Sequence, residues 1–360
     1  MLNKRGVIEV QFNWIFILIA GALILVFFAT VIYKQKEISD MRLSAEILSN
    51  MQTMTVGAES TSNLYSNIRS KGSEIRFSCE DCNCFYTLEN LISSTDISYN
   101  SRAMFVPSLI DGDKIIIFSL DWNMPYKVTN FLYLTSDKIR YVMVGNNDIL
   151  STIKESLHGG MYVSQINSPQ SYQEYINQNE QKVRFVFYDN NEMTSITVGD
   201  GETLDTKSMN YRDITAVNIK PSGNTEIGTV EFYRKKSNAE LFELMGSYPY
   251  SGIPSLIGAI IADDYNLYKC PMDDVFTRLN YVNEVYLERT RELLSTSGMD
   301  VKCTPRYISA LTELGKIKTQ SDESYITANL QTIYSAAFEE NIGLEALNGQ
   351  IRLFSCPEIY

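Results

Sequence analysis

Histidine is nearly absent from this chain, with one residue in 360, and the signatures of most enzyme classes are missing altogether. The sequence has no Walker loop, no GxGxxG, no GxSxG and no HExxH, so the common phosphate, dinucleotide, serine-hydrolase and zinc-protease motifs are excluded. The lone His158 has no identifiable nucleophile to serve and does not make a catalytic triad. The sequence therefore favours a protein that is not an enzyme, with no catalytic residue, no cofactor and no metal.

Positive charge is also scarce. The 31 lysines and arginines are outnumbered by 43 aspartates and glutamates, which gives a formal net charge of −12. A nucleic-acid-binding surface needs a basic patch to neutralise phosphates, so we expect no nucleic-acid partner. None of the asparagines lies in an Asn-x-Ser/Thr sequon, which argues mildly against secretion by a glycosylating route. Hydrophobic residues at 44% nevertheless predict a packed core.

Long apolar runs are limited to one, Phe12 to Tyr33, which contains no charged residue. Its 22 residues would form a helix about 33 Å long, enough to cross a hydrocarbon core of about 30 Å. The run is longer than the apolar part of a signal peptide, and it ends in Tyr33-Lys34 rather than at a small-residue cleavage site. We therefore predict a tail over 1–11, a single transmembrane helix over 12–33 with the lipid bilayer as its partner, and a large domain beyond it.

The orientation of this span is nearly undecided by charge. Lys4 and Arg5 precede the helix, and Lys34, Lys36 and Arg42 follow it, so the count of flanking cations leans slightly against an external domain. The short tail and the even number of cysteines favour the opposite orientation, because disulfides form outside the cytoplasm. We expect a cell-membrane protein whose C-terminal domain is extracytoplasmic.

The N-terminus combines a short basic leader, a glycine at Gly6 and a polar entry into the apolar helix. This pattern resembles the leader of type IV pilins and archaeal pilin-like proteins, and the resemblance implies cleavage at Gly6 and assembly through the helix. That family usually has glutamate five positions after the glycine, where this chain has Gln11, while its acid, Glu9, is at the third. An ordinary uncleaved signal anchor is the alternative. The segments Gln11–Phe16 and Asn130–Thr135 also resemble uncharacterised archaeal single-pass membrane proteins, which implies a location and no chemistry.

Periodicity divides the rest of the chain into three parts. Apolar residues spaced by three and four over 34–70, including Ile38, Ile47 and Met51, predict a helical stalk, or equally a helix packed on the domain. An α/β domain is expected over 71–250. A helical region packed on that domain is expected over 251–360, with helices over Pro254–Tyr268, Met272–Leu294, Thr304–Leu314 and Tyr325–Leu347.

Strands and helices alternate in the middle of the domain. Strands are expected at Ile139–Val144, Met161–Ile166 and Val183–Tyr188, with helices at Ile149–Leu157 and Ser171–Asn177 between them. Two short crossovers between three apolar strands are typical of a parallel, Rossmann-like sheet. Turn signals at Gly199–Gly201 and Pro221–Asn224 then separate strands of a β-meander. The predicted fold class is α/β, a mixed Rossmann-like sheet with a β-meander extension.

Six cysteines are clustered unevenly, three of them in Cys79-Glu80-Asp81-Cys82-Asn83-Cys84. The CxxC spacing suits zinc, but no second close pair completes four ligands, and the acidic neighbours do not suit a redox thiol. A local hairpin bridge from Cys79 to Cys84 is the most comfortable disulfide, leaving Cys82 free or paired at a distance.

The other three cysteines are isolated in the sequence. Cys270 and Cys303, if bridged, would close a helical hairpin of about 34 residues, worth about 3 to 4 kcal/mol in the loop-entropy model. Cys356 could compete for either partner. Connectivity is therefore open, with Cys79, Cys84, Cys270 and Cys303 as the expected disulfide residues.

A ligand site is best sought at Asp121-Trp122-Asn123-Met124-Pro125, which follows the apolar strand Lys114–Leu120. Ligands of α/β sheets bind at the carboxyl ends of strands, so Asp121, Trp122 and Asn123 are the candidate binding residues. A structural loop with a buried tryptophan is the competing interpretation.

Taken together, the sequence predicts a membrane-anchored, extracytoplasmic structural or surface-interaction protein. Its partner would be a second copy or another surface protein, and a pilin-like assembly is a special case. The alternative is a membrane-tethered ligand-binding receptor or hydrolase that uses the loop 121–125.

Overall fold

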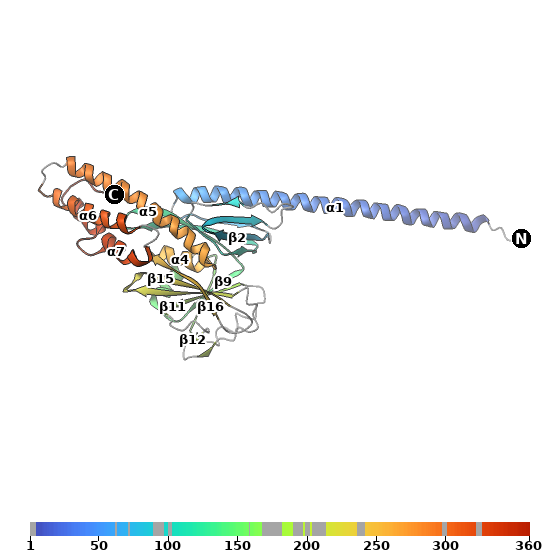
Figure 1. Cartoon of the computed structure of the whole chain (residues 1–360). Helices are drawn as coiled ribbons and strands as arrows, with labels where there is room; N and C mark the ends of the chain where they lie inside the picture. The colour runs from blue at the N-terminus through green and yellow to red at the C-terminus, as the bar shows by residue number, and fades with distance from the viewer. Residues whose placement is uncertain are drawn as a thin grey trace.

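A computed structural model of the 360-residue chain describes residues 5–61, 63–70, 73–88, 97–99, 103–157, 159–167, 182–189, 197–198, 202–203, 214–235, 242–296, 301–321 and 326–360. Helices and strands are named as in Figure 1, which shows one long helix leading away from a mixed domain of sheets and helices.

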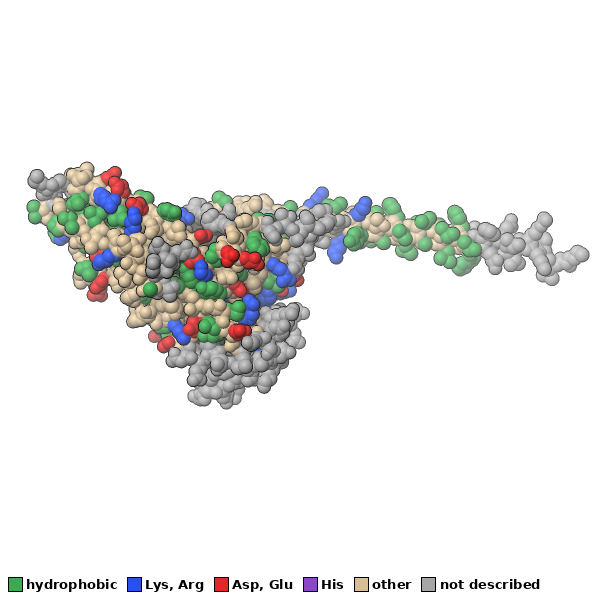
Figure 2. All heavy atoms as spheres, in the orientation of Figure 1, with side chains coloured by type: hydrophobic (Ala, Val, Ile, Leu, Met, Phe, Trp, Pro, Cys, Tyr) green, Lys and Arg blue, Asp and Glu red, His purple; other side chains and the backbone are tan. Residues whose placement is uncertain are grey.

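The long helix is α1 (Arg5–Ser60), one uninterrupted element of 56 residues, about 84 Å in length. Its segment Trp14–Lys36 is the one helix in the described chain long and apolar enough to cross a membrane, and it is not buried against the domain. Figure 2 shows apolar side chains along this protruding part, with basic side chains between it and the domain. Further along, Ile47 and Met51 are 1% and 3% exposed, so the end of α1 is part of the domain core.

α1 packs on a four-stranded sheet with the order β1-β7-β8-β5. Its members are β1 (Tyr65–Arg69), β7 (Lys114–Asn123), β8 (Lys127–Ser136) and β5 (Met104–Phe105). The chain therefore leaves the helix at Ser60, and 65–69, expected at the end of the stalk, form a strand. Pairing of β1 with β7 explains this difference, because it satisfies the backbone and buries Ile68.

A second small sheet, β4-β3-β2-β6, carries the cysteine cluster. Its strands are β2 (Ile75–Glu80), β3 (Asn83–Leu88), β4 (Ile97–Ser98) and β6 (Leu109–Ile110), and the pair β12 (Thr197–Val198) and β13 (Glu202–Thr203) stands apart. The turn between β2 and β3 has Asp81 and Cys82 at φ 48° and 58°. Two positive φ values in a two-residue loop are the geometry of a tight hairpin.

The six-stranded sheet has the order β10-β9-β11-β14-β15-β16. Its strands are β9 (Ile139–Val144), β10 (Tyr162–Ile166), β11 (Lys182–Tyr188), β14 (Ile214–Ser222), β15 (Asn224–Lys235) and β16 (Phe242–Ser251). The first four are parallel and the last two antiparallel, so the Rossmann-like sheet with its meander extension is confirmed. Asn147 accepts a hydrogen bond from the Ile149 amide and caps α2 (Asp148–Ser156). The expected helix at 171–177 lies outside the described residues.

Helix α4 (Gly252–Ile261) lies between the sheet β1-β7-β8-β5 and the six-stranded sheet. It contacts β5, β7 and β8 of one sheet and β14, β15 and β16 of the other, and its residues 255–261 are all buried. A helix that is apolar all round belongs in a core, which explains this central place. The remaining helices are α5 (Tyr265–Thr296), α6 (Thr304–Gln320), α7 (Ile326–Phe338) and α8 (Leu344–Leu353).

Several features of the C-terminal half differ from expectation. The predicted helix 325–347 forms as two helices, α7 and α8, divided at 339–343, where Asn341 has a positive φ of 71°. Helix α5 runs through Pro271, where a break was expected between residues 268 and 272.

The predicted helix 254–268 is divided at 262–264, because Asp263 accepts hydrogen bonds from Ser108 and Asp264 accepts one from the Asn266 amide. Strand β16 was not anticipated, since Gly246 and Pro249 weaken any strand signal in its sequence. It lies at the sheet edge, where such residues are tolerated. The division of the domain at residue 251 stays a prediction.

Candidate functional site

A surface pocket of about 290 Å³ opens where the end of β7, the start of α4 and helix α7 meet. It is lined by Asp121, Trp122, Asn123, Glu226, Ser251, Gly252, Ile253, Pro254, Tyr334 and Phe338. The three residues expected to bind a ligand are therefore among those that form it. They belong to β7 itself rather than to a loop after it, because β7 stays paired with β8 as far as Asn123 and Lys127.

Trp122 supplies the floor of the pocket and is only 2% exposed. Its indole Nε1 donates to the Ser251 carbonyl over 3.0 Å, and its ring stacks on Phe131 at 5.6 Å between centroids. Phe276 of α5 meets it edge-on at 5.9 Å. Trp122 is therefore packed in the core as well as lining the pocket.

The polar wall of the pocket is acidic. Asp121 accepts a hydrogen bond from Lys127 over 3.0 Å, and its side chain is 38% exposed. Glu226 and Asn123 are exposed. Burial raises the pKa of Tyr334, another lining residue, and the nearby carboxylates of Glu226 and Glu345 raise it further.

The pocket is also lined by two aromatic residues of α7, Tyr334 and Phe338, whose ring centroids are 4.9 Å apart. Carboxylates beside aromatic rings suit a positively charged group, since the ring faces and the carboxylates both attract cations. Among the described lining residues there is neither a histidine nor a cysteine, and Ser251 Oγ faces Met124 Sδ at 3.9 Å. The arrangement can bind, but it has no activated nucleophile.

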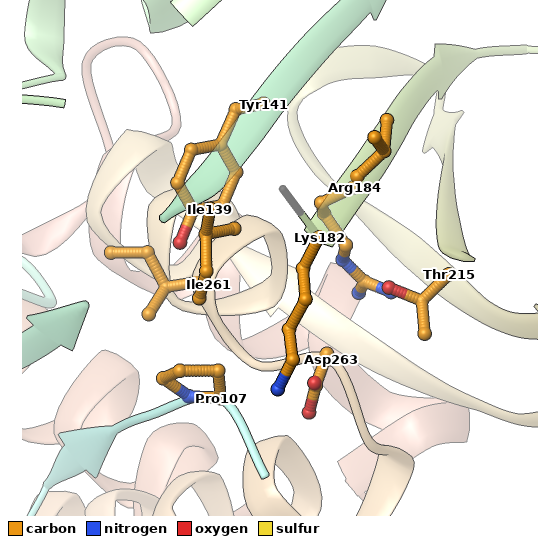
Figure 3. A pocket seen from close by; sticks show the side chains of 9 residues that line it. Pro107, Ile139, Tyr141, Lys182, Arg184, Thr215, Ile261 and Asp263 are labelled. Atoms are coloured by element: carbon orange, nitrogen blue, oxygen red, sulfur yellow. The ribbon is translucent and has the colours of Figure 1, made fainter. Parts of the chain in front are cut away.

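A second cavity, of about 20 Å³, lies at the amino ends of the parallel strands β9, β11 and β14 (Figure 3). In Figure 3 the Lys182 ammonium and the Asp263 carboxylate both point into the space beside Pro107. Lys182 donates to the Leu109 carbonyl over 3.3 Å, and Asp263 accepts from the Ser108 amide over 2.6 Å. The volume holds about one water. Ligands of such sheets bind at the opposite, carboxyl ends of the strands, so we assign no ligand here.

Arg184 of β11 lies beside this cavity and is 1% exposed. Its guanidinium donates to four backbone carbonyls, those of Ala216, Ala259, Ile260 and Ala262, over 2.6 to 3.2 Å. Three of these belong to the C-terminal end of α4, whose carbonyls have no helical partner and carry partial negative charge. Desolvation lowers the pKa of Arg184 to about 10, so the group remains charged at neutral pH. Sequence reasoning missed this residue; the only signal was a cation inside an otherwise apolar strand.

The six cysteines form three disulfides, Cys79–Cys84, Cys82–Cys270 and Cys303–Cys356. The local bridge expected between Cys79 and Cys84 is present across the hairpin. The bridge considered between Cys270 and Cys303 is not, because the fold places Cys270 against the hairpin turn and Cys303 against the C-terminal segment.

Gly6, Glu9 and Gln11 lie near the start of α1, and their side chains are outside the described part of the chain. His158 is also outside it. Comparison of the chain with protein-family models, curated proteins and solved structures found no match. The apolar helix and the three disulfides together indicate an extracytoplasmic protein, either secreted or membrane-anchored.

Proposed function

We propose that this protein is a membrane-anchored surface protein whose work is presentation. In this proposal α1 spans the bilayer and holds the disulfide-bonded domain outside the cytoplasm, where the domain contacts a second copy or another surface protein. The supporting observation is the continuity of α1, which runs from the apolar span into the domain core without a break.

The continuity of α1 limits how far the domain can stand from the bilayer. Ile47, which is buried in the core, lies 11 positions after Lys36, the end of the span. At 1.5 Å per residue this is about 16 Å of helix. A flexible linker would let the domain change its distance and orientation relative to the bilayer. A short rigid helix fixes both, so the same face of the domain always points away from the membrane.

Thiol labelling on intact cells tests the location. A membrane-impermeant maleimide should modify no cysteine of the native protein and should modify all six after reduction, because external disulfides block every thiol. No labelling even after reduction would contradict an external domain, because the impermeant reagent does not reach a cytoplasmic one. Thiols that react without reduction would contradict the disulfides.

Site-specific photo-crosslinking tests the partner. A photoreactive residue at Leu25, 72% exposed within the span, reports contacts between helices, and one at Val285, 65% exposed on α5, reports contacts of the domain. Crosslinks between copies from Leu25 would support assembly through the membrane helix. Crosslinks from Val285 would identify a surface partner, and none from either position would contradict the proposal.

A pilin-like assembly is the special case in which the leader is removed after Gly6. Mass spectrometry of the native N-terminus decides it: a chain beginning at Val7 supports processing, and an intact start before Gly6 excludes it.

The second candidate function is binding of a cationic ligand in the pocket between β7 and α7. It is favoured by the carboxylates of Asp121 and Glu226 and the rings of Tyr334 and Phe338, which line the same pocket. A fluorescent oligo-arginine peptide should bind the full chain in detergent, and Asp121→Asn with Glu226→Gln should weaken the binding at least tenfold. Glu288→Gln, an exposed carboxylate on α5, is the control for non-specific attraction to the acidic surface. Equal losses in the two variants would reject the pocket as the site.

A further inference from the structure

Four of the six cysteines come together at one place, although one of them, Cys270, lies 188 residues after Cys82 in the sequence. Cys79 and Cys84 face each other on β2 and β3, Cys82 is in the turn between these strands, and Cys270 comes from α5. The Sγ atoms of Cys79, Cys84 and Cys270 all lie within 4.8 Å of one another, and Cys82 Sγ is bonded to Cys270 Sγ. Two disulfides are thus packed side by side as one cluster of four sulfurs.

We propose that in the reduced chain these four cysteines form a tetrathiolate zinc site. Zinc–sulfur bonds of about 2.3 Å in a tetrahedron place neighbouring sulfurs about 3.8 Å apart. The sulfurs of Cys79, Cys84 and Cys270, already within 4.8 Å of one another, therefore need to move by only about 1 Å, and Cys82 Sγ starts from its bond to Cys270 Sγ. The sequence argued against zinc because it lacks a second close pair of ligands. The fold supplies the missing ligand from 188 residues away.

The hairpin itself has the shape that zinc ligation requires. The spacing Cys79-x-x-Cys82 places two thiolates within reach of one ion, and the tight turn with positive φ at Asp81 and Cys82 keeps both on the same end of the hairpin. Cys79, Cys84 and Cys270 are 4% to 6% exposed, so a bound ion would be largely shielded from water.

The groups around the cluster also suit thiolates. The Tyr99 hydroxyl lies 3.7 Å from Cys79 Sγ and acts as the donor, since a bridged or metal-bound sulfur carries no proton. Such donors to ligand sulfurs are typical of metal sites. The nearby Asp273 carboxylate, 3.7 Å from Cys82 Sγ, is hydrogen-bonded by Lys269 and Tyr248, which offset its charge.

The two states exchange by a balanced redox step. Two equivalents of an external disulfide, each accepting two electrons and becoming two thiolates, convert the four zinc-bound thiolates into the two bridges and release Zn²⁺. In the reverse direction, a phosphine reduces each bridge with one water, becoming phosphine oxide and leaving two thiols. Zinc then displaces four protons from four thiols. In either state the hairpin stays attached to α5, by the ion or by Cys82–Cys270.

The test uses the full chain in detergent, reduced with a water-soluble phosphine and then given one equivalent of Zn²⁺. We expect native mass spectrometry to show one zinc per chain. Alkylation should then spare Cys79, Cys82, Cys84 and Cys270, while Cys303 and Cys356 are modified. The oxidised chain should retain no zinc.

Variants separate this site from adventitious binding. Cys303→Ser with Cys356→Ser removes the distant bridge and should keep one zinc, whereas Cys270→Ser should bind zinc at least tenfold more weakly. The wild-type alkylation pattern does not depend on whether a variant folds. Absence of retained zinc, or protection that fails to separate these four thiols from the other two, would overturn the proposal.

Discussion

Buried charge in this molecule is placed where the backbone can satisfy it. Within the described part of the chain, Arg184 makes no hydrogen bond to a carboxylate. It donates to the carbonyl end of α4 and lies 5.4 Å from the centre of the Phe232 ring. Each of these carbonyls would otherwise be buried without a donor, which costs about 1 to 3 kcal/mol per group. One side chain on β11 therefore attaches the central helix to the six-stranded sheet.

Replacing Arg184 with methionine should destabilise the fold by at least about 3 kcal/mol, because several buried carbonyls lose their only charged donor. Urea unfolding of the full chain in detergent measures the change. The matched variant is Arg234→Met, which removes an exposed pair with Asp264 and should cost at most about 1 kcal/mol. Equal costs for the two variants would contradict the capping role.

Glu231 on β15 predicts a loss of stability in acid. Burial alone raises the pKa of this carboxyl, but hydrogen bonds from Lys220, Tyr233 and Asn218 outweigh it and hold the pKa below the usual 4.5. As the pH falls through 4.5, the unfolded state takes up the proton first, so this contribution to the free energy of unfolding is present above pH 4.5 and is lost below it. The free energy of unfolding, measured between pH 3 and 7 at about unit steps, should therefore fall less steeply with acid for Glu231→Gln than for the wild type. Glu288→Gln on the exposed surface of α5 should reproduce the wild-type profile.

At the scale of elements, the disulfides differ in how much of the chain they restrain. Cys79–Cys84 closes 5 residues within one hairpin, whereas Cys82–Cys270 closes 188 and joins the hairpin to α5. A bridge stabilises mainly by restricting the unfolded chain, and more so for longer loops.

We therefore expect Cys82→Ser with Cys270→Ser to cost about 5 kcal/mol, and Cys79→Ser with Cys84→Ser about 2 kcal/mol, in the loop-entropy model. Both cysteines of a bridge are replaced so that no free thiol can exchange. Denaturant midpoints under oxidising conditions compare them. A larger loss from the local bridge would show that packing at the hairpin, rather than chain entropy, dominates.

Elements with a local cause were predictable. The turn signals around β9, α2 and β10 and the Asn147 cap correspond to what forms, because turns and caps depend on neighbouring residues. The break between α4 and α5 was not predictable from neighbouring residues. It depends on the hydrogen bond from the Ser108 amide to Asp263, and Ser108 lies 155 residues earlier in the chain. Edge strand β16 was missed for the same reason: its partner β15 gives it its conformation.

At the scale of the whole molecule, α1 has two parts with different environments. Residues 14–36 are not buried against the domain, whereas Ile47 and Met51 contribute to its core. The first part is an apolar surface that needs a lipid or protein environment, and the second is a structural helix of the domain.

Removal of residues 1–36 should therefore leave a folded, water-soluble domain, because no domain contact is lost. In this shortened chain Ile47→Ala should cost about 2 to 5 kcal/mol, since it empties a buried site. In the full chain Leu25→Ala, at an exposed position of the span, should leave domain stability unchanged. Thermal unfolding followed by circular dichroism distinguishes these cases. A shortened chain that does not fold would show that the span also stabilises the domain.

The sequence by itself determined the features that depend on composition or on near neighbours. These are the single apolar span, the acidic balance that argues against nucleic acid, the parallel strands of the sheet and the hairpin bridge Cys79–Cys84. Only the tertiary structure decided the pairing of Cys82 with Cys270, the cap that Arg184 makes on α4, and the pocket shared by Asp121 and Tyr334. Each of these joins residues far apart in the chain, and their meeting depends on how sheets and helices pack rather than on any local pattern.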